Sequence, residues 1–290
     1  MKIQFLGTAA AEGAPALFCD CDVCRYAREK GGKEIRTRSG AMIDDLLKID
    51  FGPDSYHHAL VNGLDYSKVH SLFITHTHSD HLQLKEFACR KPPYAHAPEN
   101  DPPMTVYGNA AVGEKLAPFL SDRTLFHEMK PFETVEAEGY RVTALEAVHC
   151  VSSDAAAGYP VVHEGKTYLR SEQALFYLFE KDGESILYAH DTDEFTQADL
   201  DFLAGKKLDV ISMDCTNGHL ELDYVGHMGI RENKRMREKL LANGAADEHT
   251  IFVAHHFSHN GLLPYEEMEK RLPGFLVSYD SMIEIGRAHV

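Results

Sequence analysis

Residues 76–81 carry side chains that suit metal binding better than a protein core. They read HTHSDH and directly follow the apolar run SLFIT at 71–75, which predicts a buried strand. Imidazole and carboxylate groups are common ligands of divalent cations, and they are costly to bury together without such a partner. A terminal tag or a solvated loop would explain clustered histidines, but this cluster is internal and follows an apolar strand. The spacing therefore predicts a site for a pair of metal ions.

Three later predicted strands also run into histidine or aspartate. These ends are His149 after 142–148, His190-Asp191 after 186–189, and His255-His256 after 251–254. In a layered α/β fold, functional groups gather at the edge where strands give way to loops. Four such strand ends indicate one shared site.

A second cluster consists of three cysteines with C-x-C-x-x-C spacing. Cys19, Cys21 and Cys24 lie close enough that their thiolates would need a cation or an oxidant. His259 is a candidate fourth ligand, because His256 belongs to the first site. Buried thiols or a redox pair are the alternatives for the cysteines, and a solvated loop histidine is the alternative for His259.

Composition restricts the classes of partner. The 290 residues include 29 Lys plus Arg and 45 Asp plus Glu, which gives a formal net charge of −16. Broad nucleic-acid binding depends on a basic surface, so nucleic acid is disfavoured, whereas a small anion held by metal ions is not. No apolar run has membrane-spanning length. The N-terminus does not resemble a signal peptide, and the six cysteines suggest a reducing compartment, so we expect a cytoplasmic protein.

Strand-like and helix-like runs alternate along the chain, which predicts an α/β class. The predicted strands are Lys2–Leu6, Leu46–Asp50, Val69–Thr75, Met104–Tyr107, Tyr140–Ala147, Gln173–Glu180, Ser185–Ala189, Leu208–Met213, Thr250–Ala254, Phe275–Ser278 and Met282–Ile285. The predicted helices are Asn109–Leu120, Thr196–Ala204, Arg231–Asn243 and Pro264–Arg271. Lys91–Pro103 and Ser152–Ser171 read as long loops, either lids or plain surface insertions.

The order of these motifs resembles the metallo-β-lactamase superfamily, in which H-x-H-x-D-H is followed by His, Asp and His. The matching positions are His76, His78, Asp80, His81, His149, Asp191 and His256. The resemblance covers essentially the whole chain. It implies an α/β fold, a four-layer αββα sandwich, formed by one domain over residues 1–290 with a cysteine loop at 19–24 and a long loop at 152–171.

The resemblance also implies a ligand set for two zinc or manganese ions that share a bridging hydroxide. One ion would bind His76, His78 and His149; the other would bind Asp80, His81 and His256; Asp191 would bridge both. The superfamily's earlier aspartate matches Asp50, which we expect to orient a ligand histidine. A purely structural role in capping a loop is the alternative for Asp50.

Within the superfamily, the chain resembles the phosphoribosyl cyclic phosphate phosphodiesterases of the carbon–phosphorus lyase (phosphonate) pathway. The shared features are an early Gly7-Thr8 turn, the cysteine cluster, MDC at 213–215 and HFSH at 256–259. This branch implies a structural zinc on Cys19, Cys21, Cys24 and His259. It also implies that His227 protonates the leaving oxygen, with a surface or helix-capping histidine as the alternative.

The expected function is metal-dependent hydrolysis of a small or cyclic phosphodiester, with Asp80 and His227 among the catalytic residues. The alternatives are another hydrolase of the same fold (a tRNA 3′-processing nuclease, a thioester hydrolase or a lactamase) or a non-catalytic metal-containing binding protein. The expected partner is a small phosphodiester, without nucleic acid or membrane, and a homodimer is left open. The two long loops differ from the resembled branch, so the substrate does not carry over with the metal site.

Overall fold

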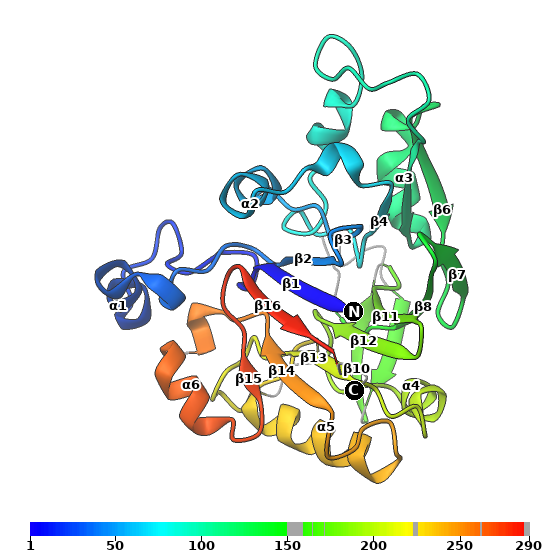
Figure 1. The fold of residues 1–290 in the computed structure, drawn as a ribbon. Helices are drawn as coiled ribbons and strands as arrows, with labels where there is room; N and C mark the ends of the chain where they lie inside the picture. Colours follow the sequence, from blue (N-terminus) through cyan, green and yellow to red (C-terminus); the bar gives the residue numbers. More distant parts are fainter. Residues whose placement is uncertain (150–158, 164, 171, 223–225, 262, 287–290) are drawn as a thin grey trace.

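The computed structural model describes residues 1–149, 159–163, 165–170, 172–222, 226–261 and 263–286. Two seven-stranded sheets pack face to face, and helices cover their outer faces (Figure 1). The predicted αββα sandwich is confirmed. No helix among the described residues is long and apolar enough to cross a membrane.

The first sheet has the strand order β16-β1-β2-β3-β4-β5-β6. Its strands are β1 (Lys2–Gly7), β2 (Gly40–Ile43), β3 (Leu47–Ile49), β4 (Ser71–Phe73), β5 (Met104–Gly108), β6 (Thr124–Glu128) and β16 (Met282–Ile285). Strands β3 to β6 run parallel, so their carboxyl ends lie at one edge of the sheet.

The second sheet has the order β15-β14-β13-β12-β11-β8-β7. Its strands are β7 (Thr134–Ala137), β8 (Tyr140–Glu146), β11 (Leu175–Lys181), β12 (Glu184–Ala189), β13 (Val210–Asp214), β14 (Ile251–His255) and β15 (Leu276–Val277). Strands β12 to β15 are parallel, and β8 runs in the same direction because it pairs antiparallel with β11. The residues after β8, β12, β13 and β14 therefore lie at a common edge.

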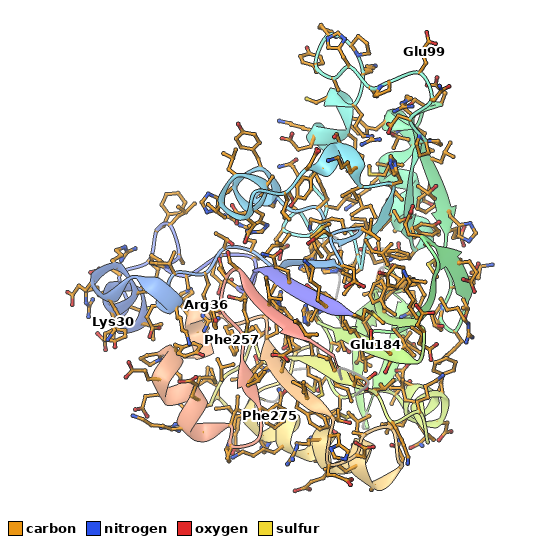
Figure 2. All side chains as sticks on the ribbon, viewed as in Figure 1. Lys30, Arg36, Glu99, Glu184, Phe257 and Phe275 are labelled. Carbon is orange, nitrogen blue, oxygen red and sulfur yellow. The ribbon has the colours of Figure 1, made fainter. Side chains whose placement is uncertain are left out.

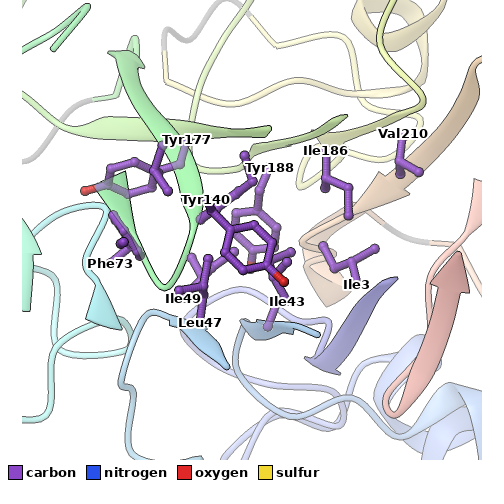
Figure 3. Close-up of a cluster of buried hydrophobic side chains, with 14 of the residues drawn as sticks. Ile3, Ile43, Leu47, Ile49, Phe73, Tyr140, Tyr177, Ile186, Tyr188 and Val210 are labelled. Atoms are coloured by element: carbon purple, nitrogen blue, oxygen red, sulfur yellow. The ribbon is translucent and has the colours of Figure 1, made fainter. Parts of the chain in front are cut away.

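The main core lies between the sheets and follows from alternation along the strands. Leu47 and Ile49 of β3 point into it, opposite Tyr177 and Tyr188 of the second sheet (Figure 3). Because successive side chains of a strand point to opposite faces, Lys48 is on the outer face of the first sheet. It is nevertheless only 1% exposed.

Among the described residues, six α-helices complete the layers. They are α1 (Asp22–Lys30), α2 (Ser55–Asn62), α3 (Ala110–Leu116), α4 (Gln197–Leu203), α5 (Ile230–Ala242) and α6 (Tyr265–Arg271). Helix α3 buries Val112 and Leu116 against the first sheet. Helices α4 and α5 bury Leu203 and Met236 against the second sheet. The helices pack on the outer faces of the sheets. Loops form the edge at which the parallel strands end.

Two sequence-based interpretations of loops need correction. Within 152–171, residues Tyr159–His163 (β9) and Lys166–Arg170 (β10) form an antiparallel hairpin, with Gly165 at a φ of +79° in the turn. Residues 152–158, 164 and 171 lie outside the described residues. The expected cysteine loop at 19–24 is a loop only in part, because α1 begins at Asp22 and contains Cys24.

The sequence patterns did not predict several other elements. These are α1, α2, β2, β6 and β7. Lys91–Pro103 contains no helix or strand, as expected. The segment that links α1 to β2 is held against the second half of the chain by Arg36. Its guanidinium donates to Thr8 Oγ1 (2.9 Å) and to the Ser278 carbonyl (2.7 Å), and it lies over the ring of Phe257 at 4.3 Å (Figure 2).

Candidate metal centre

The HTHSDH segment leaves the first sheet directly beside Asp50. β3 and β4 are parallel neighbours, so the residues that follow them turn into the same space. Asp50 has a φ of +54°, which is unusual for a residue other than glycine and is typical of functional sites. Its Oδ1 accepts hydrogen bonds from the backbone N–H of Thr75 (2.8 Å) and from Thr75 Oγ1 (3.0 Å). These bonds fix the point at which the histidine-rich loop begins.

The first group of candidate ligands consists of three histidines. His76 Nε2 lies 2.8 Å from His78 Nδ1, and His149 Nε2 lies 3.3 Å from that same Nδ1. One nitrogen of each ring is within 4.8 Å of the others, so the three could hold a single ion. The structure therefore brings His149, which follows β8, to the two histidines that follow β4.

The second group combines Asp80, His81 and His256, whose ligand atoms also lie within 4.8 Å of one another. Asp191 lies between the two groups. Its Oδ2 is 2.8 Å from His81 Nε2 and 3.1 Å from His256 Nε2. Its Oδ1 is 3.8 Å from His149 Nε2. The carboxylate of Asp191 thus reaches both groups, which is the arrangement that a bridging ligand requires.

The donor atoms of the second group fit a cation better than a hydrogen-bond network. Among the described residues, none forms a hydrogen bond of acceptable geometry with His81 Nε2, His256 Nε2 or Asp191 Oδ2, although all three atoms are buried. Buried polar atoms are normally paired, and an unpaired one costs free energy. These three converge instead on a common point, as ligand atoms do. The residues present therefore fit a pair of divalent cations.

The two groups differ in their electrostatics. Burial lowers the pKa of His76 and His78, and it lowers that of His149 to about 3, so these imidazoles are neutral and keep a lone pair for a metal. Burial also opposes the charged forms of His81 and His256, but the neighbouring carboxylates, Asp191 above all, raise their pKa. The carboxylates around the second group thus favour a positive charge there.

Three of the candidate ligand histidines are oriented through their other ring nitrogen. Asp50 Oδ2 lies 2.7 Å from His81 Nδ1, so Asp50 occupies the orienting position expected from the sequence. His149 Nδ1 donates to the Gly226 carbonyl at 3.1 Å. His256 Nδ1 lies 2.8 Å from Thr216 Oγ1. Such bonds fix the ring and the tautomer that faces a metal.

His227 lies beside the candidate ligands, in the loop between β13 and α5. Its Nδ1 lies 2.9 Å from Asp214 Oδ2, and its ring centroid is 4.9 Å from that of His149. Burial opposes the charged form of His227, but the carboxylate of Asp214 outweighs it and raises the pKa to about 9. A histidine held in this way can donate a proton next to the candidate ligands. Residues 223–225, which precede Gly226, lie outside the described residues.

Sequence reasoning missed two acidic groups. Asp214 ends β13, and its position at a strand end was a usable signal. Glu172 had no such signal. Its carboxylate accepts from the backbone N–H of Thr77 (3.1 Å) and from Asn109 Nδ2 (2.8 Å), so it ties the histidine-rich loop to the start of α3. His190 and His255 are buried and bond to serine hydroxyls.

The cysteine cluster forms a separate candidate site. Cys19, Cys21, Cys24 and His259 each place a ligand atom within 4.8 Å of the others. His259 Nδ1 is 3.5 Å from the sulfurs of both Cys19 and Cys21, and none of the three cysteines forms a disulfide. Burial opposes ionisation of Cys21, but hydrogen bonds from the Cys24 backbone and from His259 lower its pKa to about 6. This geometry suits a tetrahedral zinc site.

Comparison with known proteins identifies relatives of the fold. Residues 49–257 match the family model described as the beta-lactamase superfamily domain. A diphosphatase from the PhnP family is 21% identical, with a TM-score of 0.73, and the match covers 99% of this chain and 98% of that one. Zn²⁺-bound PqqB from Methylobacterium extorquens is 18% identical, with a TM-score of 0.75 and coverage of 98% and 100%. At these identities, the two structures show a common fold alone.

Curated sequences give shorter matches. A ribonuclease Z from Listeria innocua serovar 6a is 26% identical over 183 residues, which is 57% of this chain and 50% of that protein. The chain spans half or less of the length of the curated relatives it matches. These matches therefore do not carry the activity of a whole relative over to this chain.

Proposed function

Since this chain belongs to the β-lactamase superfamily, whose members are mostly metal-dependent hydrolases, we propose that it hydrolyses a small or cyclic phosphodiester with two divalent cations. The proposal goes beyond the family, because members of one fold act on different substrates. The cations would bind in two groups: His76, His78 and His149 for one, and Asp80, His81 and His256 for the other, with Asp191 shared. Zinc and manganese both suit such mixed ligands.

One observation carries the proposal. His227 is fixed by Asp214 at 2.9 Å and lies against His149, so a proton donor stands next to the candidate ligands. Hydrolysis of a phosphodiester expels an alkoxide, which needs a proton as it leaves. A chain that only bound metal for structure would have no use for this arrangement.

The chain's own residues have separate tasks in the proposed reaction. Asp214 holds Nδ1 of His227 and so directs the opposite ring edge toward the leaving oxygen. Asp80 and Asp191 offset positive charge and fix the positions of the two groups. Asp50, through His81, keeps that ring in place during the reaction. When bound, the cations would supply Lewis acidity toward water and toward the phosphoryl oxygens.

A ribonuclease-type activity is the second candidate, and the ribonuclease Z match favours it. The formal net charge of −16 opposes it, because binding of a tRNA backbone depends on Lys and Arg. The same charge does not exclude a small diester that is bound by the metals themselves. We therefore place the small substrate first.

A substrate panel tests this choice. Metal-reconstituted protein is assayed with 2′,3′-cyclic AMP, a 3′-extended tRNA, an acyl thioester and a chromogenic cephalosporin. We expect metal-dependent turnover of the cyclic diester, lost in Asp191→Ala and kept in Asp201→Ala, an exposed aspartate used as the control. Turnover of the tRNA, the thioester or the lactam that is faster than turnover of the cyclic diester would contradict the proposed substrate class.

We also propose that the protein is cytoplasmic. Cys19, Cys21, Cys24 and His259 would bind a structural zinc. The zinc would fix the segment that precedes α1 to the η5 turn (His259–Gly261). Zinc analysis of the purified protein, with the catalytic cations removed by dialysis, tests this part separately.

A further inference from the structure

A cavity of about 580 Å³ lies on the outer face of the first sheet. It is enclosed by that sheet, by the segments at 66–69 and 86–90, and by residues 95–98 of the Lys91–Pro103 loop. That loop extends from the body of the molecule and carries Glu99 (Figure 2). None of the proposed metal ligands lines the cavity. Its volume is in the range of small-molecule sites, about 300–1,000 Å³.

One wall of the cavity is aromatic. The ring of Phe51 lies 5.9 Å from that of Tyr66 and 5.6 Å from that of Phe87, measured between centroids. Leu72 and Met104, both buried, extend this apolar surface along the strands. Aromatic rings favour flat apolar partners through stacked and edge-on contacts. The walls therefore suit an aromatic body.

One polar group in the cavity wall has no hydrogen-bond partner among the described residues. The hydroxyl oxygen of Tyr66 is buried, and no described residue forms a hydrogen bond with it. Such a group costs free energy unless a ligand or water pairs with it. The hydroxyl lies next to the aromatic wall, so it can donate to an oxygen of a bound molecule.

Two cations line the cavity without an ionic partner. The ammonium group of Lys48 donates to the carbonyls of Ile49 (2.8 Å) and Asp50 (2.5 Å). Arg90 donates to Thr124 Oγ1 (3.1 Å) and to the Arg123 carbonyl (3.2 Å). Within the described part of the chain, neither forms an ion pair with a carboxylate. Arg123 differs, because it pairs with Asp101.

Burial lowers the pKa of both basic side chains. Lys48 is 1% exposed, and burial lowers its pKa to about 7. Burial, together with nearby Arg123, also lowers the pKa of Arg90. Glu86 also lines the cavity, but it is exposed to solvent. A buried lysine and a half-buried arginine, neither paired with a carboxylate, together with an apolar wall are complementary to an anion with an apolar body, and a bound anion would favour the protonated form of Lys48.

We propose that this cavity binds a small aromatic carboxylate, whose ring packs against Phe51 and Phe87. Its carboxylate is held by Lys48 and Arg90, and Tyr66 donates to one of its oxygens. The site is separate from the proposed metal centre and does not depend on the proposed reaction.

The test is calorimetric titration of the metal-loaded protein with 2-naphthoate and with neutral 2-naphthylmethanol. We expect the carboxylate to bind at least about tenfold more tightly, the ratio that one charge-assisted hydrogen bond supplies. Lys48→Met and Arg90→Leu should each weaken naphthoate binding by about tenfold and change the binding of the alcohol little. Equal affinities for the two compounds, or no binding of naphthoate at millimolar concentration, would overturn the proposal.

Further variants locate the bound molecule. Ala95→Trp fills the cavity from a half-buried loop position, so it spares the fold and should abolish binding of both compounds. Phe18→Ser, at a fully exposed apolar residue elsewhere, should bind as wild type does. Asp191→Ala should also bind naphthoate normally. Loss of binding in Phe18→Ser or Asp191→Ala, or normal binding in Ala95→Trp, would assign naphthoate to another site and contradict the proposal.

Discussion

Oδ2 of Asp214 lies 2.9 Å from Nδ1 of His227. The other oxygen of this carboxylate accepts from the backbone N–H groups of Met228 (3.1 Å) and Thr216 (2.9 Å). Asp214 is therefore fixed by the backbone on one side and orients His227 on the other. The pair joins the end of β13 to the loop before α5, next to the candidate metal ligands.

A test of the leaving group follows from this pair. If His227 protonates the leaving oxygen, His227→Ala should reduce kcat about 10²-fold or more for an alkyl diester such as 2′,3′-cyclic AMP. The loss should be much smaller for bis-p-nitrophenyl phosphate, because p-nitrophenolate leaves without a proton. Initial rates at saturating substrate measure both. Equal losses on the two substrates would show that His227 acts in some other way.

Asp50→Asn should weaken metal binding without unfolding the protein. The variant keeps the size of the side chain but disturbs the contact with His81 Nδ1, and loss of such an orienting contact costs about 10–100-fold in metal affinity or activity. Competitive metal titration gives the affinity, and Asp45→Asn at an exposed position is the matched control. Unchanged metal affinity in Asp50→Asn would favour the alternative role of Asp50, capping a loop.

Cys21→Ser should release one zinc ion and lower the melting temperature. A structural zinc contributes directly to folding, and each kcal/mol lost lowers Tm by about 2–4 °C in chains of 150–250 residues. Elemental analysis and thermal unfolding measure the two effects, and Cys89→Ser, at an exposed thiol outside the cluster, is the control. A variant that keeps both its zinc and its melting temperature would rule out the thiolate site.

Lys48 should make stability depend on pH. Burial lowers the pKa of Lys48 to about 7 from the 10.5 of the free group. Between pH 7 and 10.5 the unfolded chain therefore binds more protons at Lys48, so its contribution to stability falls by about 1.4 kcal/mol per unit as pH decreases from 10.5 to 7. Below pH 7 the loss is complete.

Urea unfolding at pH 7, 8, 9 and 10 measures whether the free energy of unfolding rises or falls with pH. The free energy of unfolding of the wild type relative to Lys48→Met should rise with pH over this range. The exposed Lys68→Met variant should show no such trend. Parallel pH curves for the wild type and Lys48→Met would mean that Lys48 stays charged in the folded protein.

The sequence was most informative where residue type and strand position agreed. The HTHSDH segment, His149, Asp191 and His256 follow apolar strands. In the second sheet, β12 to β14 are parallel and β8 runs in the same direction through β11, and these strand ends meet the end of β4 from the first sheet at one edge of the molecule. The αββα layers could be predicted from the same pattern together with the family resemblance. The role of these residues as ligands stays a prediction until a metal is measured.

The missed features depend on contacts between distant parts of the chain. Glu172 holds the histidine-rich loop because the start of β11 lies beside the end of β4, which places Glu172 next to Thr77 and next to Asn109 at the start of α3. Lys48 alternates with core residues of its strand and so reads as solvent-facing, but segments distant in the sequence cover it, and it is 1% exposed. Helix α1 carries several charged residues and so lacked a clear apolar pattern. Local patterns do not encode such tertiary contacts.

Hydrolysis of bis-p-nitrophenyl phosphate tests the central claim most directly. The wild type, His78→Ala and His249→Ala are each loaded with zinc or manganese, freed of excess metal and assayed at equal concentration; His249 is an exposed control. We predict metal-dependent turnover in the wild type and in His249→Ala. In His78→Ala we predict loss of turnover and of metal from the two-cation site, with the zinc of the cysteine cluster and the melting profile intact. Retained turnover in His78→Ala, or metal-loaded wild-type protein without turnover, would contradict a phosphodiesterase built on this site.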